Sequence, residues 1–308
     1  MKIKGVDLEA LGDQFENPRG NGKVLIIDAD GFAYQAAAKA KKLDTAVRYW
    51  LQDVLTYQFL TGCEFIKAYL TDSKCYKNGR AFYPTVKPYQ GNRNGKNKPA
   101  LLETLRAHLP HAQGMPDCLE ILLCVDDEAD AYALADAEEL GDQCVVVSQD
   151  KDFRCTTAPY WDMSTQSLDV ITDTYGWVSE ARTEGGALKA KGHGRKFLWY
   201  QLLAGDQADH VAGLTKLDGK LCGTKKALEF LEDCATEDEA ANKVLSAYLR
   251  NKQNPLAELE MVWLSTTTRP IEYLRTLNIH PKIMAYMEKL DVYHKQYIAA
   301  ARERAVQE

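Results

Sequence analysis

Residues 119–153 read LEILLCVDDEADAYALADAEELGDQCVVVSQDKDF, and this pattern predicts a strand, a helix and a second strand. The apolar runs 119–125 and 144–147 have the length of buried strands. Acidic residues follow each run: Asp126, Asp127, Glu128 and Asp130 after the first, and Asp150 and Asp152 after the second. Because the carboxyl ends of parallel strands form the ligand-binding crevice of an open α/β sheet, these side chains should converge on one place.

Two further apolar runs end in aspartate. Residues 23–32 read KVLIIDADGF and residues 65–72 read FIKAYLTD, so Asp28 and Asp72 follow predicted strands. Asp28 and Asp30 are two residues apart and would share one face of an extended chain. Asp30 could equally cap the helix that starts near Gly31, and both interpretations stay open.

The recurrence of carboxylates at strand ends predicts a metal site. Two carboxylates ~4 Å apart repel by about 4 kcal/mol at an effective dielectric of ~20, unless a cation neutralises them. Magnesium suits a site built only from carboxylates, because it keeps several waters and lets a substrate phosphate complete its octahedron. The six histidines show no placement typical of a general base.

Composition limits the class of protein. The chain has 308 residues, 45% of them apolar, and no window approaches the ~20 continuous apolar residues of a membrane helix. Its first residues lack the apolar core of a signal peptide, so we expect a cytoplasmic protein without membrane contact. Eight cysteines without a C-x-x-C pair predict neither structural zinc nor disulfides. The net charge of −6 excludes a uniformly basic coat, but it leaves room for a local basic track.

Residues 73–99, here called the basic segment, differ from the rest of the chain. They include no acidic residue, and aromatic side chains alternate with seven basic ones: Lys74, Lys77, Arg80, Lys87, Arg93, Lys96 and Lys98. Basic side chains neutralise phosphates, and aromatic faces stack on unpaired bases. The alternative is a solvated polar loop. Glycines and the low apolar content predict a mobile segment that is not fixed to a core.

The second half of the chain is predicted to be mainly helical. Short strands are expected at 160–163 and 168–171, and a Gly-rich basic loop at 182–196. Helices are expected from residue 196 onward, the last over 281–304. Asp206 and Asp209 lie three residues apart and converge if the chain turns there. Residues 221–228 read LCGTKKAL, a glycine turn into a helix start with lysines beside it, which suits phosphate binding.

Together these motifs resemble the structure-specific 5′-nucleases, which include flap endonucleases and the 5′-nuclease domain of bacterial DNA polymerase I. The similarity is closest to the 5′→3′ exonucleases of T-odd bacteriophages, and it covers roughly residues 23–233. It rests on Asp28, Asp72, KPYQGNR at 87–93, EAD at 128–130, DKD at 150–152 and GDQAD at 205–209. Ala131 stands where many members have a second aspartate, His210 stands where Asn is common, and the G-x-G hairpin is stretched over 216–223.

The resemblance implies an α/β fold: a PIN-like, mostly parallel central sheet flanked by helices over residues 1–200, with the basic segment as its arch. A helix–three-turn–helix motif and C-terminal helices follow over 201–308. It implies two Mg²⁺ ions, for which Mn²⁺ can substitute. Their ligands are Asp28, Asp72, Glu128 and Asp130 at the first site, and Asp150, Asp152, Asp206 and Asp209 at the second. Whether the stretched hairpin binds K⁺ stays open.

The implied activity is magnesium-dependent 5′→3′ exonuclease or flap endonuclease cleavage of DNA by a two-metal mechanism, in phage-type replication, recombination or primer removal. The expected partners are DNA with 5′ ends, gaps or flaps, with RNA–DNA hybrids left open, and we expect a monomer in the host cytoplasm if phage-encoded. Lys87 and Arg93 are expected at the scissile phosphate. The other expected DNA contacts are Arg80, Tyr83, Tyr89, Lys220, Gly223, Thr224, Lys225 and Lys226.

Two other functions fit part of the sequence. The IDADG run at 27–31 is also typical of haloacid dehalogenase-type phosphatases, and Gly205-Asp206 resembles their magnesium motif. That interpretation leaves Asp72, Glu128 and the basic segment without a role. A non-catalytic nucleic-acid-binding protein would gain nothing from eight carboxylates facing an anionic ligand. Magnesium-dependent release of nucleotides from DNA, rather than phosphate from a small ester, separates the three functions.

Overall fold

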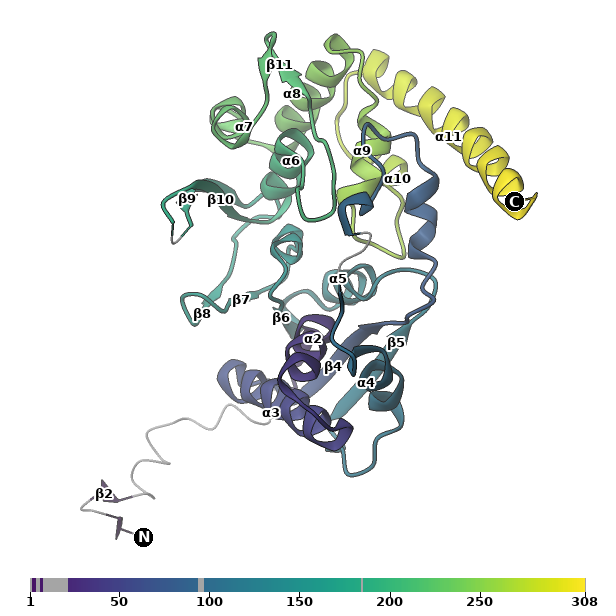
Figure 1. Ribbon diagram of the computed structural model, residues 1–308. Coiled ribbons are helices and arrows are strands. Elements are labelled where there is room, and N and C mark those ends of the chain that lie inside the picture. The colour runs from purple at the N-terminus through teal and green to yellow at the C-terminus, as the bar shows by residue number, and fades with distance from the viewer. Residues whose placement is uncertain (1, 4–5, 8–21, 94–96, 184, 308) are drawn as a thin grey trace.

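The computed structural model describes residues 2–3, 6–7, 22–93, 97–183 and 185–307. A six-stranded sheet with the order β5-β4-β3-β6-β7-β8 forms its centre (Figure 1). The strands are β3 (Val24–Asp28), β4 (Phe65–Thr71), β5 (Leu119–Cys124), β6 (Cys144–Val147), β7 (Tyr160–Asp162) and β8 (Ser167–Asp169). Neighbouring strands run parallel except β7 and β8. This mostly parallel α/β sheet confirms the predicted fold class.

Helices cover both faces of the sheet, which explains why the central strands β3 and β6 are continuous apolar runs. Leu25 and Ile27 belong to one buried cluster and Ile26 to another, so β3 contributes to both faces. The first cluster is covered by α2 (Ala29–Lys39), α3 (Leu43–Thr61) and α4 (Leu102–His108), and the second by α5 (Ala129–Leu140). β3 is fully buried from Leu25 to Ile27.

The register of the strands brings their carboxyl ends to the same edge. Ile27 pairs with Val147, and Asp28 pairs with Tyr69, so β3, β4 and β6 end within a few residues of one another. The Ala129 N–H donates to Thr71 Oγ1 (2.9 Å), which ties the start of α5 to the end of β4. The acidic residues that follow these strands therefore share one edge of the sheet.

A third buried cluster lies in the C-terminal part of the chain. It forms around α6 (Arg195–Ala204), which is buried on most of its surface. The helices around it are α7 (Thr224–Leu231), α8 (Glu237–Arg250), α9 (Pro255–Val262), α10 (Pro270–Leu274) and α11 (Pro281–Gln307). The boundary predicted between residues 200 and 201 falls inside α6, and the division into two domains stays a prediction.

Short elements complete the described chain. Two-stranded pairs form from β1 (Lys2–Ile3) with β2 (Val6–Asp7) and from β11 (Lys216–Leu217) with β12 (Lys220–Leu221). The 3-10 helices are η1 (Lys77–Phe82), η2 (Gly91–Arg93), η3 (Leu109–His111), η4 (Gly141–Gln143) and η5 (Lys151–Cys155). Within the described residues, no helix combines the length and apolar character needed to cross a membrane.

The loop predicted over 182–196 is wrong. Residues of this stretch form the antiparallel pair β9 (Trp177–Arg182) and β10 (Leu188–His193), and α6 follows directly. Frequent glycine and lysine hid the strand, yet Gly192 has a packing reason. A Cβ there would lie 2.5 Å from Phe197 Cδ2, so only glycine lets β10 approach α6 this closely.

The prediction that the basic segment has too little apolar content to be fixed to a core is also wrong. Tyr83 and Tyr89 pack against the C-terminal cluster. The segment, blue in Figure 1, lies beside α9 and α10, and η1 contacts α11. The composition of the segment did not predict this packing, because the cluster that receives the two tyrosines comes from distant parts of the chain.

Candidate metal centre

A cavity of about 380 Å³ opens at the carboxyl edge of the sheet. Five of the eight predicted metal ligands line it: Asp28, Glu128, Asp130, Asp150 and Asp209. They come from four different places, namely the ends of β3 and β6, the start of α5 and the loop after α6. The strand-end pattern therefore brings these carboxylates together, as expected from the sheet topology.

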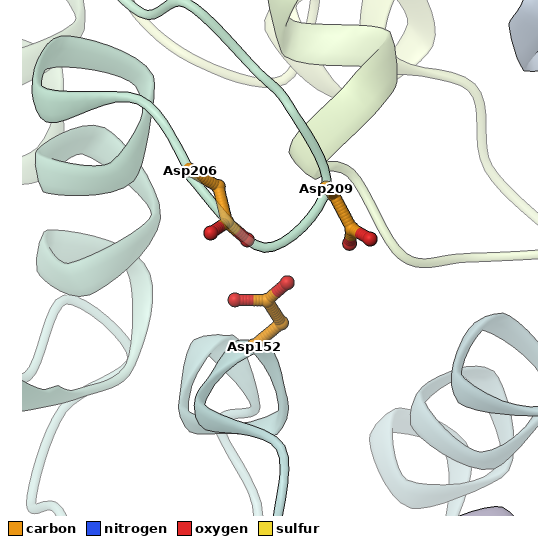
Figure 2. A group of neighbouring side chains, drawn as sticks. All are labelled: Asp152, Asp206 and Asp209. Atoms are coloured by element: carbon orange, nitrogen blue, oxygen red, sulfur yellow. The ribbon is translucent and has the colours of Figure 1, made fainter. Parts of the chain in front are cut away.

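Three ligands of the second predicted site form a tight group, and one of them, Asp209, also lines the cavity. Asp152, Asp206 and Asp209 each offer one carboxylate oxygen, and these oxygens lie within 4.8 Å of one another. Figure 2 shows Asp206 and Asp209 pointing down from the loop after α6 towards Asp152 on η5. Oxygens at this separation could hold one cation between them.

Local backbone structure fixes several of these carboxylates. Asp28 caps α2 and accepts from the Asp30 N–H (3.2 Å), while its other oxygen accepts from Ser148 Oγ (2.8 Å). Asp150 caps η5 by accepting from the Asp152 N–H (3.0 Å). Asp206 accepts from the Ala208 N–H (2.8 Å). Each cap holds the side chain in place before any ligand binds.

Burial and mutual repulsion make protonated forms of several carboxyls favourable. Burial, followed by the charge of Asp30, raises the pKa of Asp28 to about 7. Burial and the charge of Glu128 raise the pKa of Asp130 well above its usual value, and burial and Asp150 do the same for Asp152. A bound cation would reverse these shifts, because it stabilises the ionised form.

Two carboxyls of the centre behave differently because each has a cationic neighbour. Burial raises the pKa of Glu128, but Arg80 and Lys77 outweigh burial and lower it overall. Burial acts in the same way on Asp206, where the Lys151 ammonium outweighs it and the pKa is again lowered. Lys151 Nζ lies 2.7 Å from Asp152 Oδ1 and 2.9 Å from Asp206 Oδ2.

Asp30 and Asp72 are placed differently from the other aspartates. Asp30 lines the cavity, pairs with Arg106 Nε (2.9 Å) and accepts from the Thr71 N–H (3.2 Å). Asp72 accepts from the Lys74 N–H (2.7 Å). Thr71 lines the cavity, but Asp72 is not among the described residues that line it.

The basic segment reaches into the centre through Tyr89 and Gln90. Tyr89 Oη donates to Glu128 Oε2 (2.6 Å). Gln90 Nε2 lies 3.0 Å from Glu128 Oε1 and 3.2 Å from Asp209 Oδ1, so one amide bridges a ligand of each predicted metal site. Gln90 also has a positive φ of 52°, a conformation that costs free energy and is typical of functional positions.

The structure corrects the prediction that Arg80 contacts DNA. Arg80 is only 3% exposed, and its Nη1 lies 2.6 Å from Asp127 Oδ1 and 3.2 Å from Glu128 Oε2. Its Nη2 donates to the Trp263 carbonyl (3.3 Å). Arg80 therefore joins the basic segment to the start of α5 and to the C-terminal helices.

The other predicted DNA contacts of the basic segment are less constrained. Lys87 is exposed. Tyr83 packs edge-on against His294, and the Arg80 guanidinium covers the ring of Tyr89. The side chain of Arg93 and residues 94–96 lie outside the described part of the structure. Stacking of these tyrosines on bases, and phosphate contacts of Lys87 and Arg93, stay predictions.

The predicted phosphate-binding turn starts α7. Gly223 caps the helix, and Lys220 and Lys225 are exposed. Tyr200 Oη donates to Thr224 Oγ1 (3.2 Å), whereas Lys226 Nζ donates to the Leu217 carbonyl (3.1 Å). The stretched hairpin before α7 is a tight β-turn, in which Asp218 and Gly219 have φ values of 49° and 75°.

Solved structures of bacteriophage T5 proteins share this architecture. A T5 flap endonuclease in a pseudo-enzyme–product complex with DNA and metal ions superposes with a TM-score of 0.52 at 12% identity, over 91% of this chain and 99% of that chain. The chain has the T5 5′-nuclease fold.

Two further T5 structures match less well. A T5 protein co-crystallised with metal ions has a TM-score of 0.49 at 13% identity, over 92% of this chain and 98% of that one. A T5 5′-exonuclease mutant has a TM-score of 0.46 at 13% identity, over 79% and 89%. No protein-family model and no curated protein sequence matches the chain, so its likeness to the T5 5′-nucleases is one of fold.

Within the 5′-nuclease fold, sequence reasoning missed the roles of Gln90 and Lys151. Both lie inside the motifs quoted above, KPYQGNR and DKD, which is the only signal that marks them. Their roles depend on contacts with carboxylates far along the chain, such as the 119-residue separation between Gln90 and Asp209. Such contacts follow from the tertiary structure and leave no periodic pattern.

The donor set of this centre fits divalent metal ions. The carboxylates supply only oxygen ligands, which hard cations such as Mg²⁺ prefer. The oxygens of Asp152, Asp206 and Asp209 lie close enough to share one ion. Asp28, Glu128 and Asp130 line the adjoining cavity.

Proposed function

We propose that the protein is a magnesium-dependent 5′→3′ exonuclease or flap endonuclease that hydrolyses phosphodiester bonds of DNA. The observation that carries the proposal is the convergence of seven predicted ligand carboxylates at the carboxyl edge of one parallel sheet. Two divalent ions bound there would activate a water and stabilise the leaving oxygen of an in-line displacement. Mn²⁺ would substitute for Mg²⁺, because it also prefers oxygen ligands.

The carboxylates divide into two groups in this mechanism. Asp28, Glu128 and Asp130 would hold the first ion, with Asp72 as a further candidate beside β4. Asp150, Asp152, Asp206 and Asp209 would hold the second. The caps on Asp28, Asp150 and Asp206 keep one oxygen of each carboxylate fixed, so the ligands are preorganised before metal and substrate bind.

Basic groups around the centre would place the DNA. Lys87 and Arg93 would contact the scissile phosphate and stabilise its developing charge. Tyr83 or Tyr89 would stack on an unpaired base after the basic segment opens. The exposed N-terminus of α7, with Gly223, Thr224, Lys225 and Lys226, and nearby Lys220 would bind backbone phosphates of the duplex without reading its sequence.

The DNA and metal ions bound by the T5 flap endonuclease of the same fold support this proposal. The phosphatase alternative is weaker, because it requires Asp30 as an acid and base. In the structure Asp30 is engaged by Arg106 and by the Thr71 N–H. We further propose that the protein acts as a monomer in a bacterial cytoplasm during phage-type DNA replication. Cleavage of RNA in hybrids and K⁺ binding at the hairpin before α7 stay open.

End-labelled duplex, gapped and flapped DNA, incubated with Mg²⁺ or with a chelator, tests the function. We expect metal-dependent release of nucleotides or short oligonucleotides from 5′ ends. DNA binding without release at any Mg²⁺ concentration would identify a binding protein instead. Release of phosphate from a small ester, with DNA left intact, would support a phosphatase.

A further inference from the structure

A lysine occupies the place where the second metal ion would be expected. Lys151 Nζ lies 2.7 Å from Asp152 Oδ1 and 2.9 Å from Asp206 Oδ2, both of which belong to the three-carboxylate group. The two aspartates come from different elements, η5 and the loop after α6 (Figure 2). The ammonium therefore neutralises carboxylates that would otherwise repel each other across this junction.

A metal ion and this ammonium compete for the same oxygens. Mg²⁺ binds carboxylate oxygens at ~2.0–2.1 Å, and a lysine ammonium donates to them at ~2.7–2.9 Å. If both bound Asp152 and Asp206 together, two positive charges would lie roughly 4 Å apart, and they would repel strongly in a partly buried site. Neutral Gln201, whose Nε2 also donates to Asp152 Oδ1, needs no such displacement.

A groove beside the three carboxylates can receive the displaced Lys151 side chain. Lys151 also lines a groove of about 850 Å³ that runs from Asp206 to Thr224 at the start of α7. The groove also contains Asp162, which pairs with Arg154 and Lys191, and the exposed Lys189. Because the Lys151 side chain is 47% exposed, its four-carbon stem can turn into this groove without unfolding η5.

We propose that Lys151 is an internal counter-ion of the second metal site, displaced when the metal binds. This inference rests on the proposed function. Lys151 would have two positions: against Asp152 and Asp206 without metal, and in the groove with metal. The displaced ammonium then adds positive charge to a surface that faces a substrate phosphate. Metal loading thereby prepares the protein for DNA, and Lys151 acts as a positioning residue.

The competition predicts a measurable change in metal affinity. In Lys151→Gln no internal cation must leave, so the weaker of two Mg²⁺ binding steps should tighten by at least about tenfold. The metal-free variant should also melt at a lower temperature than the wild type, because the carboxylates lose their counter-ion. Isothermal titration calorimetry with Mg²⁺ and thermal melting in a chelator give both readouts without any activity assay.

Two control variants separate the role of Lys151 from general charge effects. Lys189→Gln removes one positive charge from the same groove, where Lys189 is exposed, and should leave both binding steps unchanged. Lys151→Arg keeps the competing charge and should retain the weak second step. Circular dichroism of each variant checks folding, and Lys151→Arg gives a second test if Lys151→Gln does not fold.

The outcomes distinguish this inference from the proposed function. If the wild type binds two ions and Lys151→Gln binds them with unchanged or weaker affinity, the counter-ion role is wrong and the nuclease proposal stands. If Lys189→Gln tightens binding as much as Lys151→Gln, the effect is general electrostatics and the inference is also wrong. If the wild type takes up no divalent ion at pH 8, both proposals fail.

Discussion

At the scale of single residues, several aspartates of this centre have two roles. Asp28, Asp150 and Asp206 each accept a backbone N–H with one oxygen, and they also belong to the candidate metal centre. A residue that caps a turn at a strand end satisfies the local structure, so the sequence accepts an acidic residue there at low cost. The same residues become unfavourable only collectively, when several carboxylates meet without a cation.

Asp150→Asn should abolish cleavage and leave the fold intact. The asparagine oxygen can still accept the Asp152 N–H and cap η5, but it is a poor metal ligand. Equilibrium binding to DNA should be equal or tighter, because one negative charge near the phosphates is gone. Single-turnover cleavage and fluorescence anisotropy with the same DNA measure both effects. Near-normal turnover in this variant would argue against the two-metal assignment.

Asp28→Asn should change the pH dependence of stability in the absence of metal. The pKa of Asp28 is raised from 3.8 to about 7 in the folded chain, so the folded state binds this proton more tightly than the unfolded state does. The wild type therefore loses this contribution as the pH rises from about 4 to about 7. The variant has no such proton to lose.

The measurement is urea unfolding of both proteins in a chelator at several pH values. The free energy of unfolding of Asp28→Asn minus that of the wild type should increase from pH 4 to pH 7 and level off above. Subtraction cancels titrating groups that do not interact with Asp28, such as His294, whose pKa is lowered to about 4. A difference that does not vary with pH would show that the pKa of Asp28 is unperturbed.

At the scale of elements, the basic segment combines two kinds of cation. Arg80 is buried in an ion pair with Asp127 and Glu128, whereas Lys87 is exposed. Composition cannot tell these apart, because both are basic residues in a stretch without acidic ones. The position of α5, which Asp127 and Glu128 directly precede, determines which cation is internal.

Arg80→Ala and Lys87→Ala should therefore affect different properties, the first stability and the second turnover. Removing Arg80 leaves Asp127 buried without its partner and should cost roughly 3–5 kcal/mol of stability. Removing Lys87 should leave stability unchanged and lower turnover by about 10²-fold, as expected for one electrostatic group at the scissile phosphate. Urea unfolding and single-turnover cleavage of both variants test this. If Arg80→Ala were as stable as the wild type, the buried pair would have no structural role.

The same contrast explains how far the sequence predicted the fold and the site. Strands β3, β4, β5 and β6 were predictable, because sheets covered on both faces need continuous apolar runs. Their terminal carboxylates were predictable because parallel strands end at one edge. The β9–β10 pair was not, since β10 (LKAKGH) offers only Leu188 and Ala190 as apolar side chains beside its lysines and glycine. Tyr89, Gln90 and Lys151 depend on long-range contacts that no local pattern records.

At the scale of the whole molecule, acidic and basic residues lie in different places. The net charge is −6, yet the acidic residues of the centre are buried or line a cavity, and exposed lysines stand at the start of α7. A chain of this kind can bind DNA through a local basic surface although its overall charge is unfavourable. Binding should therefore depend strongly on salt.

Lys225→Ala should reduce the salt dependence of DNA binding by about one phosphate contact. The Lys225 side chain is 76% exposed, and its ammonium lies 3.9 Å from Glu229 Oε1, so it is available to phosphate. The slope of log K against log salt should become less negative by ~0.9 for a duplex. Glu272→Gln, an exposed change away from α7, is the control. An unaltered slope for Lys225→Ala would place the DNA elsewhere.

The contacts of the basic segment also determine when, during synthesis of the chain, the candidate site can be completed. Arg80 Nη2 donates to the Trp263 carbonyl, and the Val86 N–H donates to Glu258 Oε1, across 183 and 172 residues of chain. Ribosomes release the N-terminal part first. A nascent chain with only its first 200 residues lacks Asp206, Asp209 and the partners of the basic segment. A protein that cleaves DNA as proposed should therefore become competent only late in synthesis, after these residues have been translated.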